Sequence, residues 1–200
     1  MTRLTPPSAA GAAEAAARFA ALAPADVFYT EIDTPVGRLL AARTQRGLAR
    51  LAYEDVNDGA DAVLDDLSVR LSPRILENPA RLDDVRRELD EYFEHKRTDF
   101  DLAIDFAAVR GDFARRLLRA CARIPYGATS SYREMATRAG SPAAVRAAGN
   151  ALGANPIPIV VPCHRVIGAD GSLTGFASGL ARKQWLLNHE RSHAASALTA

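Results

Sequence analysis

A cysteine and a histidine stand side by side in the stretch PCHRVIG, residues 162–168. Cys163 directly follows the apolar run IPIVV and its proline, and polar residues resume at His164 and Arg165. A thiol acts as a nucleophile when a nearby base takes its proton and a third group orients that base. Apolar surroundings work against this, because burial raises the pKa of a thiol. The motif alone leaves two interpretations open, a nucleophile and an inert core residue.

A carboxylate that would orient the histidine follows in the helical segment KQWLLNHE, as Glu190. Because sequence neighbours usually point apart, we expect His164 to reach Cys163 through a water molecule or across a turn. The second cysteine, Cys121, lies on the apolar face of a predicted helix, where a packed core residue is expected. No Cys/His cluster has the spacing of zinc ligands, so we predict neither a metal site nor a disulfide framework.

The composition is that of an ordinary globular protein, with 200 residues of which 48% are hydrophobic and 24% charged. No apolar run approaches the roughly 18–20 residues of a membrane span, and the cysteine pattern suits a reducing cytoplasm. The alanine-rich N-terminus is interrupted by Glu14 and Arg18, which excludes the apolar core of a signal peptide. We expect a cytoplasmic protein with a flexible extension at residues 1–25 and a tail at 193–200.

Residues 26–105 predict a small α+β domain made of a sheet and a helix. Between residues 27 and 55, β-rich stretches are broken at TPVG and TQRG, which is typical of strands joined by turns. Apolar residues then recur at helical spacing in RLDDVRRELDEYFEHKR, at Leu82, Val85, Leu89, Tyr92 and Phe93. The segment between these two parts, which contains Pro73 and Pro79, shows no clear pattern.

Residues 106–192 predict a largely helical domain, so the expected fold class is α+β with two parts. The stretch GDFARRLLRACARIPYG has a helical apolar face of Phe113, Leu117, Ala120 and Cys121. SSYREMATRAG predicts a short helix, and SPAAVRAAGNALG a second one with Ser141 as N-cap and Pro142 in the first turn. Asn155 before Pro156 ends that helix, and IPIVV predicts a short buried strand.

Two helices joined by a short glycine-containing turn have the shape of a helix-turn-helix, whose second helix enters a DNA groove. Here the second helix carries almost only small residues, and Arg146 is its one long side chain. Such a helix offers little hydrogen bonding to base edges. It fits either tight packing inside the protein or insertion into a groove without sequence preference.

The charge distribution is uneven but does not decide whether this helix packs inside the protein or enters a DNA groove. Residues 110–146 hold eight arginines against two carboxylates, whereas residues 51–109 hold sixteen acidic residues against seven basic ones. A basic block beside an acidic one suggests that only one part of the chain meets a polyanion. A solvated helix face rich in arginine explains the block equally well.

Three stretches in this order resemble the O6-alkylguanine-DNA alkyltransferases, also called methylated-DNA–protein-cysteine methyltransferases: IPYGATSSY, NPIPIVVPCHRVIG and GFASGLARKQWLL. The resemblance is dense from about Arg110 to Arg191 and loose in the N-terminal half. It implies a DNA repair protein that transfers the alkyl group of O6-alkylguanine, and of O4-alkylthymine, irreversibly to its own cysteine. The implied partner is double-stranded DNA, bound by a monomer through the minor groove without sequence preference. No cofactor is implied.

The resemblance also assigns roles to individual residues. Cys163 matches the alkyl acceptor, and His164 matches the histidine that reaches it through a water molecule. Glu190 matches the carboxylate that holds this histidine. Asn155 matches the asparagine that shapes the active-site turn, and Arg146 matches the arginine that intercalates where the flipped base was.

Further matched residues surround the base and the DNA. Tyr132 matches the tyrosine that abuts the phosphate of the flipped nucleotide and the guanine edge. The loop GFASG would close over the base, with the amides of Ala177 and Ser178 near the guanine O6. The carbonyls of Cys163 and Val166 would accept from the exocyclic amine. The other implied contacts are Phe176 in the base pocket and Ala147, Ala148, Gly149 and Asn150 at the DNA.

The implied activity agrees with physical expectation. A base inside a duplex cannot meet a buried thiol, so it must be flipped out at a cost of a few kcal/mol. An inserted arginine fills the gap, and a helix of small residues fits the narrow minor groove. Because lesions occur in any sequence, a helix that cannot read bases suits this task. The resulting thioether is stable, so each molecule would act once.

Three positions depart from the family pattern. Leu118 stands where the family often has tryptophan, which changes packing, and Phe176 stands where many members have tyrosine, which removes a hydroxyl. Ser178 replaces a common glycine, which narrows access for bulky adducts. Two other classes remain as alternatives: a module that binds alkylated DNA without repairing it, and a cysteine hydrolase. The retained cysteine argues against the first, and single turnover would distinguish the second.

Overall fold

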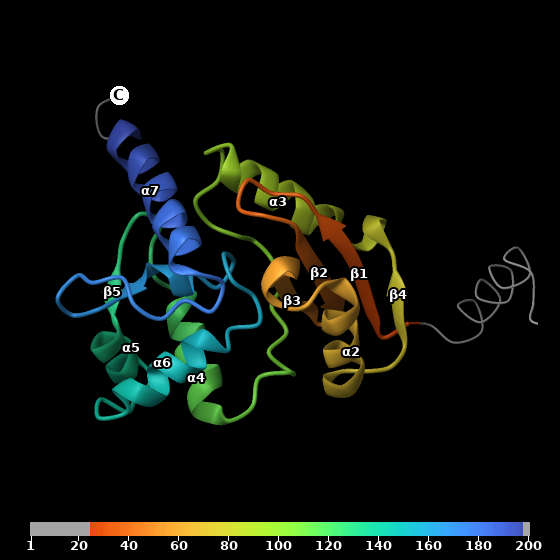
Figure 1. Cartoon of the computed structure of the whole chain (residues 1–200), viewed down its shortest axis with the longest axis horizontal. Coiled ribbons are helices and arrows are strands. Elements are labelled where there is room, and N and C mark those ends of the chain that lie inside the picture. Colours follow the sequence, from red (N-terminus) through yellow and green to blue (C-terminus); the bar gives the residue numbers. More distant parts are fainter. Residues whose placement is uncertain (1–24, 198–200) are drawn as a thin grey trace, which may run out of the picture.

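The computed structural model describes residues 25–197 and consists of a sheet half followed by a helical half (Figure 1). In the sheet, β1, β2 and β3 are antiparallel neighbours, and β4 lies parallel to β1 on the other side, giving the order β3-β2-β1-β4. The strands are β1 (Val27–Ile32), β2 (Leu39–Thr44), β3 (Gly47–Tyr53) and β4 (Ile75–Glu77). The strands expected around TPVG and TQRG are confirmed. The extension expected at residues 1–25 lies outside the described residues, apart from Ala25.

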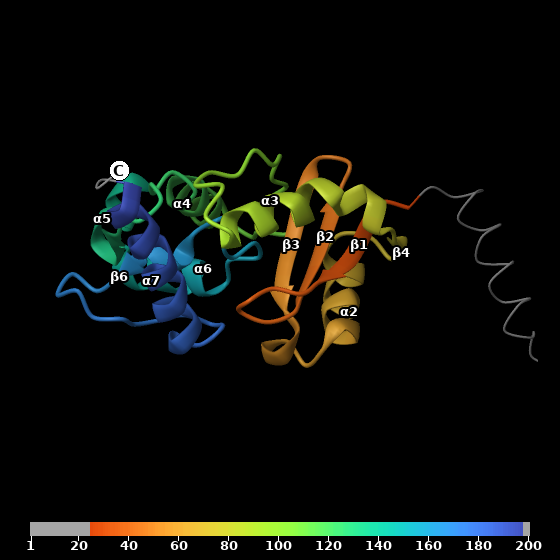
Figure 2. The same ribbon diagram turned by 90° about the horizontal axis from the view of Figure 1, so that it is seen from above.

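Helix α3 (Asp83–Phe93), which follows the short helix η2 (Pro79–Leu82), covers one face of the sheet (Figure 2). Its buried side chains pack in one cluster with Leu39 and Ala41 of β2. The residues of α3 and η2 in this cluster are Leu82, Val85, Leu89 and Tyr92. The helix predicted from their spacing is confirmed.

Helix α2 (Ala60–Arg70), which follows the short helix η1 (Glu54–Val56), covers the opposite face. It packs Val63 and Leu67 against Leu40 and Ala42 of β2, because neighbouring residues of a strand point to opposite faces. These two residues alone are buried in α2, within a segment rich in aspartate. That weak apolar pattern explains why the sequence showed no helix here.

The outer edge of β3 is covered by the chain that joins the two halves. Leu48 donates its N–H to the carbonyl of Ala103 at 2.8 Å and accepts from the N–H of Asp105 at 2.8 Å. Gly47 has a φ of +137°, and a Cβ at this position would lie 2.2 Å from the carbonyl oxygen of Ala103. Only glycine permits so close an approach at the start of β3.

The second half is built from helices and confirms the predicted α+β class. They are α4 (Asp112–Cys121), α5 (Tyr132–Arg138), α6 (Val145–Gly153), the one-turn η3 (Cys163–Arg165) and α7 (Leu180–Ala197). Two short strands, β5 (Ser130–Ser131) and β6 (Val166–Ile167), pair in parallel and so tie the start of α5 to the end of η3. Helix α7 continues to Ala197, past residue 192 where we expected the domain to end. None of the helices within residues 25–197 is long and apolar enough to cross a membrane.

One hydrophobic core joins the two halves. It contains Leu51 of β3 and Leu89 of α3 together with Leu117, Leu118 and Cys121 of α4. The burial of Cys121 confirms that this cysteine is a core residue. Because the core is shared, packing of the sheet also fixes the position of the helical half.

Helix α6 begins at Val145 rather than at Pro142, so the predicted N-cap at Ser141 is wrong. The preceding residues form a turn in which the N–H of Ala144 donates to the carbonyl of Ser141 at 2.9 Å. Proline is compatible with the first turn of a helix and with a β-turn. Here Pro142 lies in the turn that links α5 to α6.

The run IPIVV is not a strand, so that prediction is also wrong. Residues 157–161 form successive turns, in which the N–H of Val161 donates to the carbonyl of Ile157 at 2.9 Å. Ile159 has a φ of +74°, outside the extended region. The run is flanked and interrupted by prolines, which cannot donate to a ladder. The turns instead bring Cys163 back beneath the end of α6.

Candidate active site

Cys163 is the first residue of η3, and 6% of its surface is exposed. The side-chain amide of Asn155 donates to the Cys163 sulfur at 3.1 Å and to the carbonyl of Val161 at 2.8 Å. The amide oxygen of Asn155 accepts from the N–H of Ile157 at 3.1 Å. One side chain therefore closes the turn and contacts the sulfur.

The N-terminal sheet holds the same turn from the other side. The N–H of Leu51 in β3 donates to the carbonyl of Pro156 at 2.8 Å. An edge strand otherwise leaves such N–H groups unpaired. This bond gives the N–H of Leu51 a partner and holds Pro156, the residue next to Asn155, in place. The sheet half therefore contributes to the position of the Cys163 sulfur, which Asn155 contacts.

His164 contacts Glu190 of α7, and neither side chain has any exposed surface. The Nε2 atom of His164 lies 2.8 Å from Oε1 of Glu190. Nδ1 of His164 is buried and has no hydrogen-bond partner within residues 25–197. An ionised carboxylate only accepts, so the proton belongs on Nε2 and Nδ1 is the free acceptor. The imidazole is thus oriented as a base.

The Glu190 carboxylate has further donors around it. It accepts from the hydroxyl of Tyr92 at 2.8 Å and from the N–H of Gly127 at 3.0 Å. The guanidinium of Arg165 lies 2.9 Å from each carboxylate oxygen. Burial alone would raise the pKa of Glu190, but the bonds from His164 and Arg165 hold it at about 2. The carboxylate is therefore ionised at neutral pH.

Burial favours the neutral forms of both the Cys163 thiol and the His164 imidazole. It lowers the pKa of His164, although Glu190 acts in the opposite direction, so the imidazole is neutral at pH 7. It raises the pKa of Cys163, although the Asn155 amide and the charge of Lys183 act against it. A thiol that stays protonated at neutral pH needs a base to become a nucleophile.

Lys183 is a buried cation that our sequence reasoning missed. Its ammonium group donates to the carbonyl of Val166 at 2.6 Å and to that of Thr174 at 2.7 Å. It thereby joins the strand after η3 to the loop before α7. The available signal was its spacing, because Lys183 lies two turns before Glu190 on the same face of one helix.

The loop of residues 174–179 lies against Tyr132 of α5. The Tyr132 hydroxyl lies 2.8 Å from the carbonyl oxygen of Thr174 and 3.0 Å from that of Gly175, to which it donates. Of the predicted base-pocket residues, Phe176 and Ser178 are half-buried and Ala177 is exposed. The Tyr132 side chain is thus in direct contact with this loop.

Arg182 of α7, also missed from the sequence, fastens this loop to the sheet half. It donates to the carbonyl of Ser178 at 3.0 Å and to that of Val36 at 2.7 Å. It also pairs with the carboxylate of Asp55, and its guanidinium lies 4.5 Å from the ring centre of Tyr53. The loop is therefore anchored at both ends, by Lys183 and by Arg182.

Helix α6 exposes one face to solvent, with Arg146, Ala147 and Asn150 on it. Gly149 is half-buried, and a Cβ at this position would lie 4.0 Å from the ring of Tyr132. Ala148 has no exposed surface. The prediction that Ala148 contacts DNA is therefore wrong, because the helical period turns this residue into the core.

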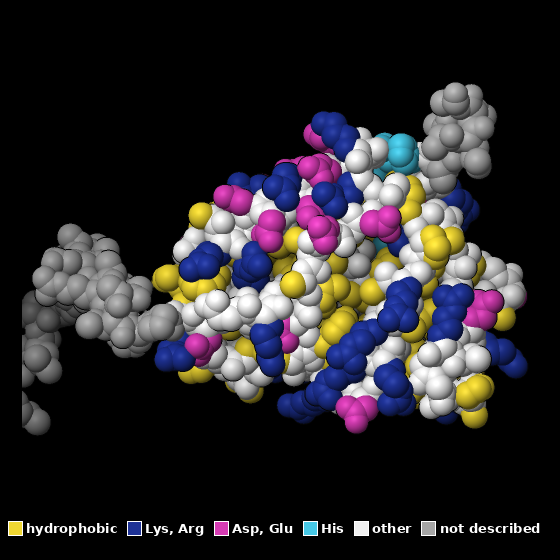
Figure 3. Space-filling view, turned by 180° about the vertical axis from the view of Figure 1, so that it is seen from behind, with side chains coloured by type: hydrophobic (Ala, Val, Ile, Leu, Met, Phe, Trp, Pro, Cys, Tyr) yellow, Lys and Arg dark blue, Asp and Glu magenta, His cyan; other side chains and the backbone are white. Residues whose placement is uncertain are grey.

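Basic side chains gather on the helical half, and a row of them crosses the lower part of the face shown in Figure 3. Of the eight arginines between residues 110 and 146, all but the half-buried Arg115 are exposed. A concentration of exposed cations on one half of the molecule favours a polyanionic partner there.

The described part of the chain contains no group of three or more His, Cys, Asp or Glu residues that could hold a metal ion. The structure brings together the four predicted catalytic residues, Asn155, Cys163, His164 and Glu190. A thiol, a neutral imidazole and a carboxylate that orients it form the arrangement of assisted nucleophilic attack.

Two family models match nearly all of the described chain. Residues 27–106 match the 6-O-methylguanine DNA methyltransferase, ribonuclease-like domain, and residues 112–192 match the 6-O-methylguanine DNA methyltransferase, DNA binding domain. The chain belongs to the 6-O-methylguanine DNA methyltransferase family. The family and the enzyme class expected from the sequence are confirmed.

Two relatives illustrate the similarity of this methyltransferase to other members. It is 42% identical over 177 residues to the methylated-DNA–protein-cysteine methyltransferase of Mycolicibacterium paratuberculosis, which covers 86% of this chain and 96% of the relative. It is 38% identical over 167 residues to the protein of the same name from Methanosarcina barkeri, and the match covers 84% of this chain and 99% of that relative.

Solved structures show the same fold. The crystal structure of Mycobacterium tuberculosis O6-methylguanine methyltransferase has a TM-score of 0.70 at 39% identity, covering 84% of this chain and 94% of that one. The crystal structure of Mycobacterium tuberculosis OGT in complex with DNA has the same TM-score and identity, and the match covers 83% of this chain and 94% of that one. The sheet half and the helical half of the methyltransferase both fall within the matched region.

The Glu190 network predicts a loss of stability in acid. The pKa of Glu190 in the folded protein is about 2, below its ordinary value of 4.5. Such a carboxylate stabilises the fold above its unfolded pKa and loses this contribution as the pH falls through its folded pKa. We expect the free energy of unfolding to decrease between pH 4.5 and about 2, by on the order of 3 kcal/mol from this group.

Urea unfolding of the wild type and of Glu190→Gln at several pH values in this range isolates the contribution of Glu190. The two proteins share every other carboxylate. The difference between them in how steeply the free energy of unfolding falls with decreasing pH is therefore assigned to Glu190. If the free energy of unfolding fell equally steeply with pH in both proteins, the assignment would be contradicted.

Proposed function

We propose that this methyltransferase repairs DNA by transferring the alkyl group of O6-alkylguanine irreversibly to the sulfur of Cys163. The observation that carries the proposal is the buried pair of His164 and Glu190, with a free imidazole nitrogen, behind a thiol that Asn155 holds. We extend the proposal to O4-alkylthymine, whose alkyl group is attached to an equivalent exocyclic oxygen.

The reaction is a displacement at the alkyl carbon. Nδ1 of His164 receives the thiol proton through a water molecule as the Cys163 sulfur attacks the carbon bonded to O6. The S–C bond forms while the C–O6 bond breaks, and the electron pair of that bond leaves with O6. Guanine regains its carbonyl and takes up a proton at N1, supplied by the imidazolium. The thioether is stable, so each molecule acts once.

The charges around His164 support this step. Accepting a proton turns the buried imidazole into a cation, and the ionised Glu190 opposite Nε2 stabilises that cation. Arg165 and Tyr92 keep the carboxylate ionised and in place. Asn155 donates to the sulfur and therefore favours the thiolate that develops during attack.

We further propose that α5 and α6 form a helix-turn-helix that binds double-stranded DNA through the minor groove without sequence preference. The exposed face of α6 carries small side chains and Arg146, which would fill the gap left by the flipped base. Tyr132 would abut the phosphate of the flipped nucleotide. The amides of Ala177 and Ser178 would lie near the guanine O6, with the side chain of Phe176 at the base.

The carbonyls of Cys163 and Val166 would accept from the exocyclic amine of guanine. The Val166 oxygen accepts from Lys183, and a carbonyl oxygen can accept two hydrogen bonds. We expect domain limits at residues 26–105 and 106–192. We also expect a monomer in the cytoplasm, where a reducing environment keeps Cys163 as a thiol.

Intact-mass analysis after reaction with a duplex containing O6-methylguanine tests the proposal. We expect one methyl group per molecule, located on Cys163, with none on Cys163→Ser. The matched control is Cys121→Ser, which removes the other thiol and should be methylated like the wild type. Continued demethylation beyond one equivalent would indicate a hydrolase, and an unmodified Cys163 would overturn the proposal.

A further inference from the structure

A cleft of about 900 Å³ lies between the two halves of the molecule. Its walls on the sheet half come from β3 and α2, and the linker at residues 108–111 closes one end. On the helical half, the wall is the exposed face of α6, with Ala147 and Asn150, followed by the active-site turn at Asn155. The loop residues Ala177 and Ser178 complete the lining. The cleft is thus continuous with the face that we assign to DNA.

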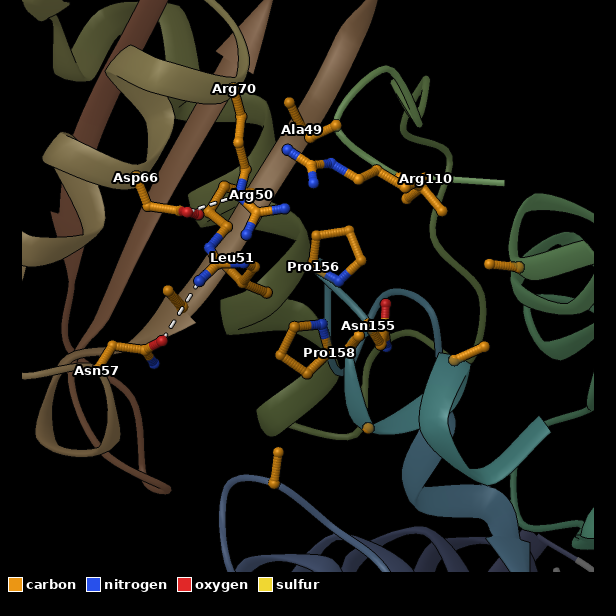
Figure 4. Close-up of a pocket in the computed structure, with 18 of the residues that line it drawn as sticks. Ala49, Arg50, Leu51, Asn57, Asp66, Arg70, Arg110, Asn155, Pro156 and Pro158 are labelled. Carbon is orange, nitrogen blue, oxygen red and sulfur yellow. Dashed lines mark hydrogen bonds and ion pairs between the residues drawn. The ribbon is translucent and has the colours of Figure 1, made fainter. Parts of the chain in front are cut away.

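Three guanidinium groups belong to this cleft, those of Arg50, Arg70 and Arg110 (Figure 4). Figure 4 shows Arg110 reaching from the linker toward Ala49 and Arg50. Asp66, paired with Arg70, is the one carboxylate among the lining residues. This leaves an excess of positive charge, although residues 51–109 hold sixteen acidic residues against seven basic ones.

Arg50 carries an unsatisfied donor in the cleft wall. One of its terminal nitrogens donates to the Asn57 side chain at 3.3 Å, whereas its buried Nε has no hydrogen-bond partner within residues 25–197. Burial lowers the pKa of Arg50, with Asp66 opposing this and Arg70 adding to it. Asp66 pairs with Arg70, and Arg50 forms no ion pair within residues 25–197. A half-buried cation without a directly paired carboxylate can accept an anionic group as its partner. The arrangement is typical of a site that awaits an anionic group.

We propose that this cleft binds the sugar–phosphate backbone of the DNA strand that passes α6, with Arg50 and Arg110 contacting phosphate oxygens. This inference rests on the proposed function and extends its DNA surface to the sheet half. Ala147 and Asn150 belong both to the exposed face of α6 and to the cleft wall, so a strand leaving α6 enters the cleft. Guanidinium groups suit this role, because their fork of N–H donors matches phosphate oxygens.

The salt dependence of duplex binding tests the cleft. Each phosphate contact contributes about −0.9 to the slope of log K against log salt for duplex DNA. We expect Arg110→Gln to reduce the magnitude of this slope by about 0.9, which corresponds to one phosphate contact. The double variant Arg50→Gln/Arg110→Gln should reduce it by about twice as much. The matched control is Arg86→Gln on α3, which removes a charge with a 43% exposed side chain on the opposite face of the sheet and should keep the wild-type slope.

The outcomes separate the cleft from the activity. Slopes of the cleft variants equal to that of the wild type, or a matching change in Arg86→Gln, would overturn the proposal for the cleft. Arg110 is exposed, so Arg110→Gln gives a result even if replacement of the half-buried Arg50 disturbs folding. Failure of the wild type to methylate Cys163 on the same duplex would instead overturn the proposed function. The rate with free O6-benzylguanine base, measured on each variant, reports the state of Cys163 without DNA.

Discussion

Replacing Glu190 by glutamine is expected to slow single-turnover transfer to Cys163 by about 10²–10⁴-fold at neutral pH, the usual contribution of general-base assistance. Glutamine keeps the shape of the side chain but removes the charge that stabilises the imidazolium of His164. The rate is measured by rapid mixing with free O6-benzylguanine base, so that DNA binding does not enter the result.

The same change also removes the carboxylate that pairs with Arg165, whose side chain is 5% exposed. Loss of one partner from a buried ion pair costs about 3–5 kcal/mol, so Glu190→Gln should unfold at a lower temperature. Leu67→Ala is the matched control, because it empties a fully buried site in the separate cluster beneath α2 at a cost of about 2–5 kcal/mol. Below both thermal midpoints, Leu67→Ala should react at the wild-type rate.

The pH profile distinguishes a base-orienting role from a structural one. A base is needed only while the thiol is protonated, and burial raises the pKa of Cys163 above its ordinary value of 9.0. The deficit of Glu190→Gln should therefore be largest near neutral pH and should narrow above pH 9.0. A deficit of equal size at every pH would show that Glu190 acts on stability alone.

The positions of Asn155, Cys163 and His164 were predictable because they fall within one short segment, where chain connectivity keeps them close. Glu190 was predictable from the family resemblance and lies on a helix that the segment packs against. Tyr92 was predicted only as a core residue, since its helical spacing says nothing about a hydroxyl that meets Glu190 98 residues later. Contacts of this kind depend on how α3 and α7 pack, which no local pattern records.

The local errors have a similar cause. An apolar run such as IPIVV satisfies a strand pattern, but its prolines lack the N–H donors that a ladder needs, and only Pro156 before it bonds to the sheet edge, through the N–H of Leu51. Lys183 and Arg165 were missed because charged residues are expected at the surface. They are buried because each finds partners there, carbonyl oxygens for Lys183 and the Glu190 carboxylate for Arg165. The two halves share a core, so these partners exist only in the assembled fold.

Replacing Arg146 by alanine is expected to lower the transfer rate on duplex DNA by on the order of 10–10²-fold relative to the rate with free base. Extruding a base costs a few kcal/mol, and each 1.36 kcal/mol of barrier is about tenfold in rate. Arg146 is the only long side chain on the exposed face of α6, so alanine leaves nothing there to fill the gap in the stack. Single-turnover rates with the duplex and with free O6-benzylguanine, measured on the same variant, give the ratio.

A matched substitution separates insertion from plain electrostatics. Arg138→Ala removes an exposed charge from the end of α5, next to α6, without touching the inserted side chain. It should weaken duplex binding through the lost charge but preserve the ratio of duplex to free-base rates at saturating DNA. The Arg146→Ala deficit should also shrink on single-stranded substrate, because an unpaired base costs least to extrude. If Arg146→Ala reduced the duplex, single-strand and free-base rates equally, the arginine would act on the Cys163 site itself and not on the flipped state.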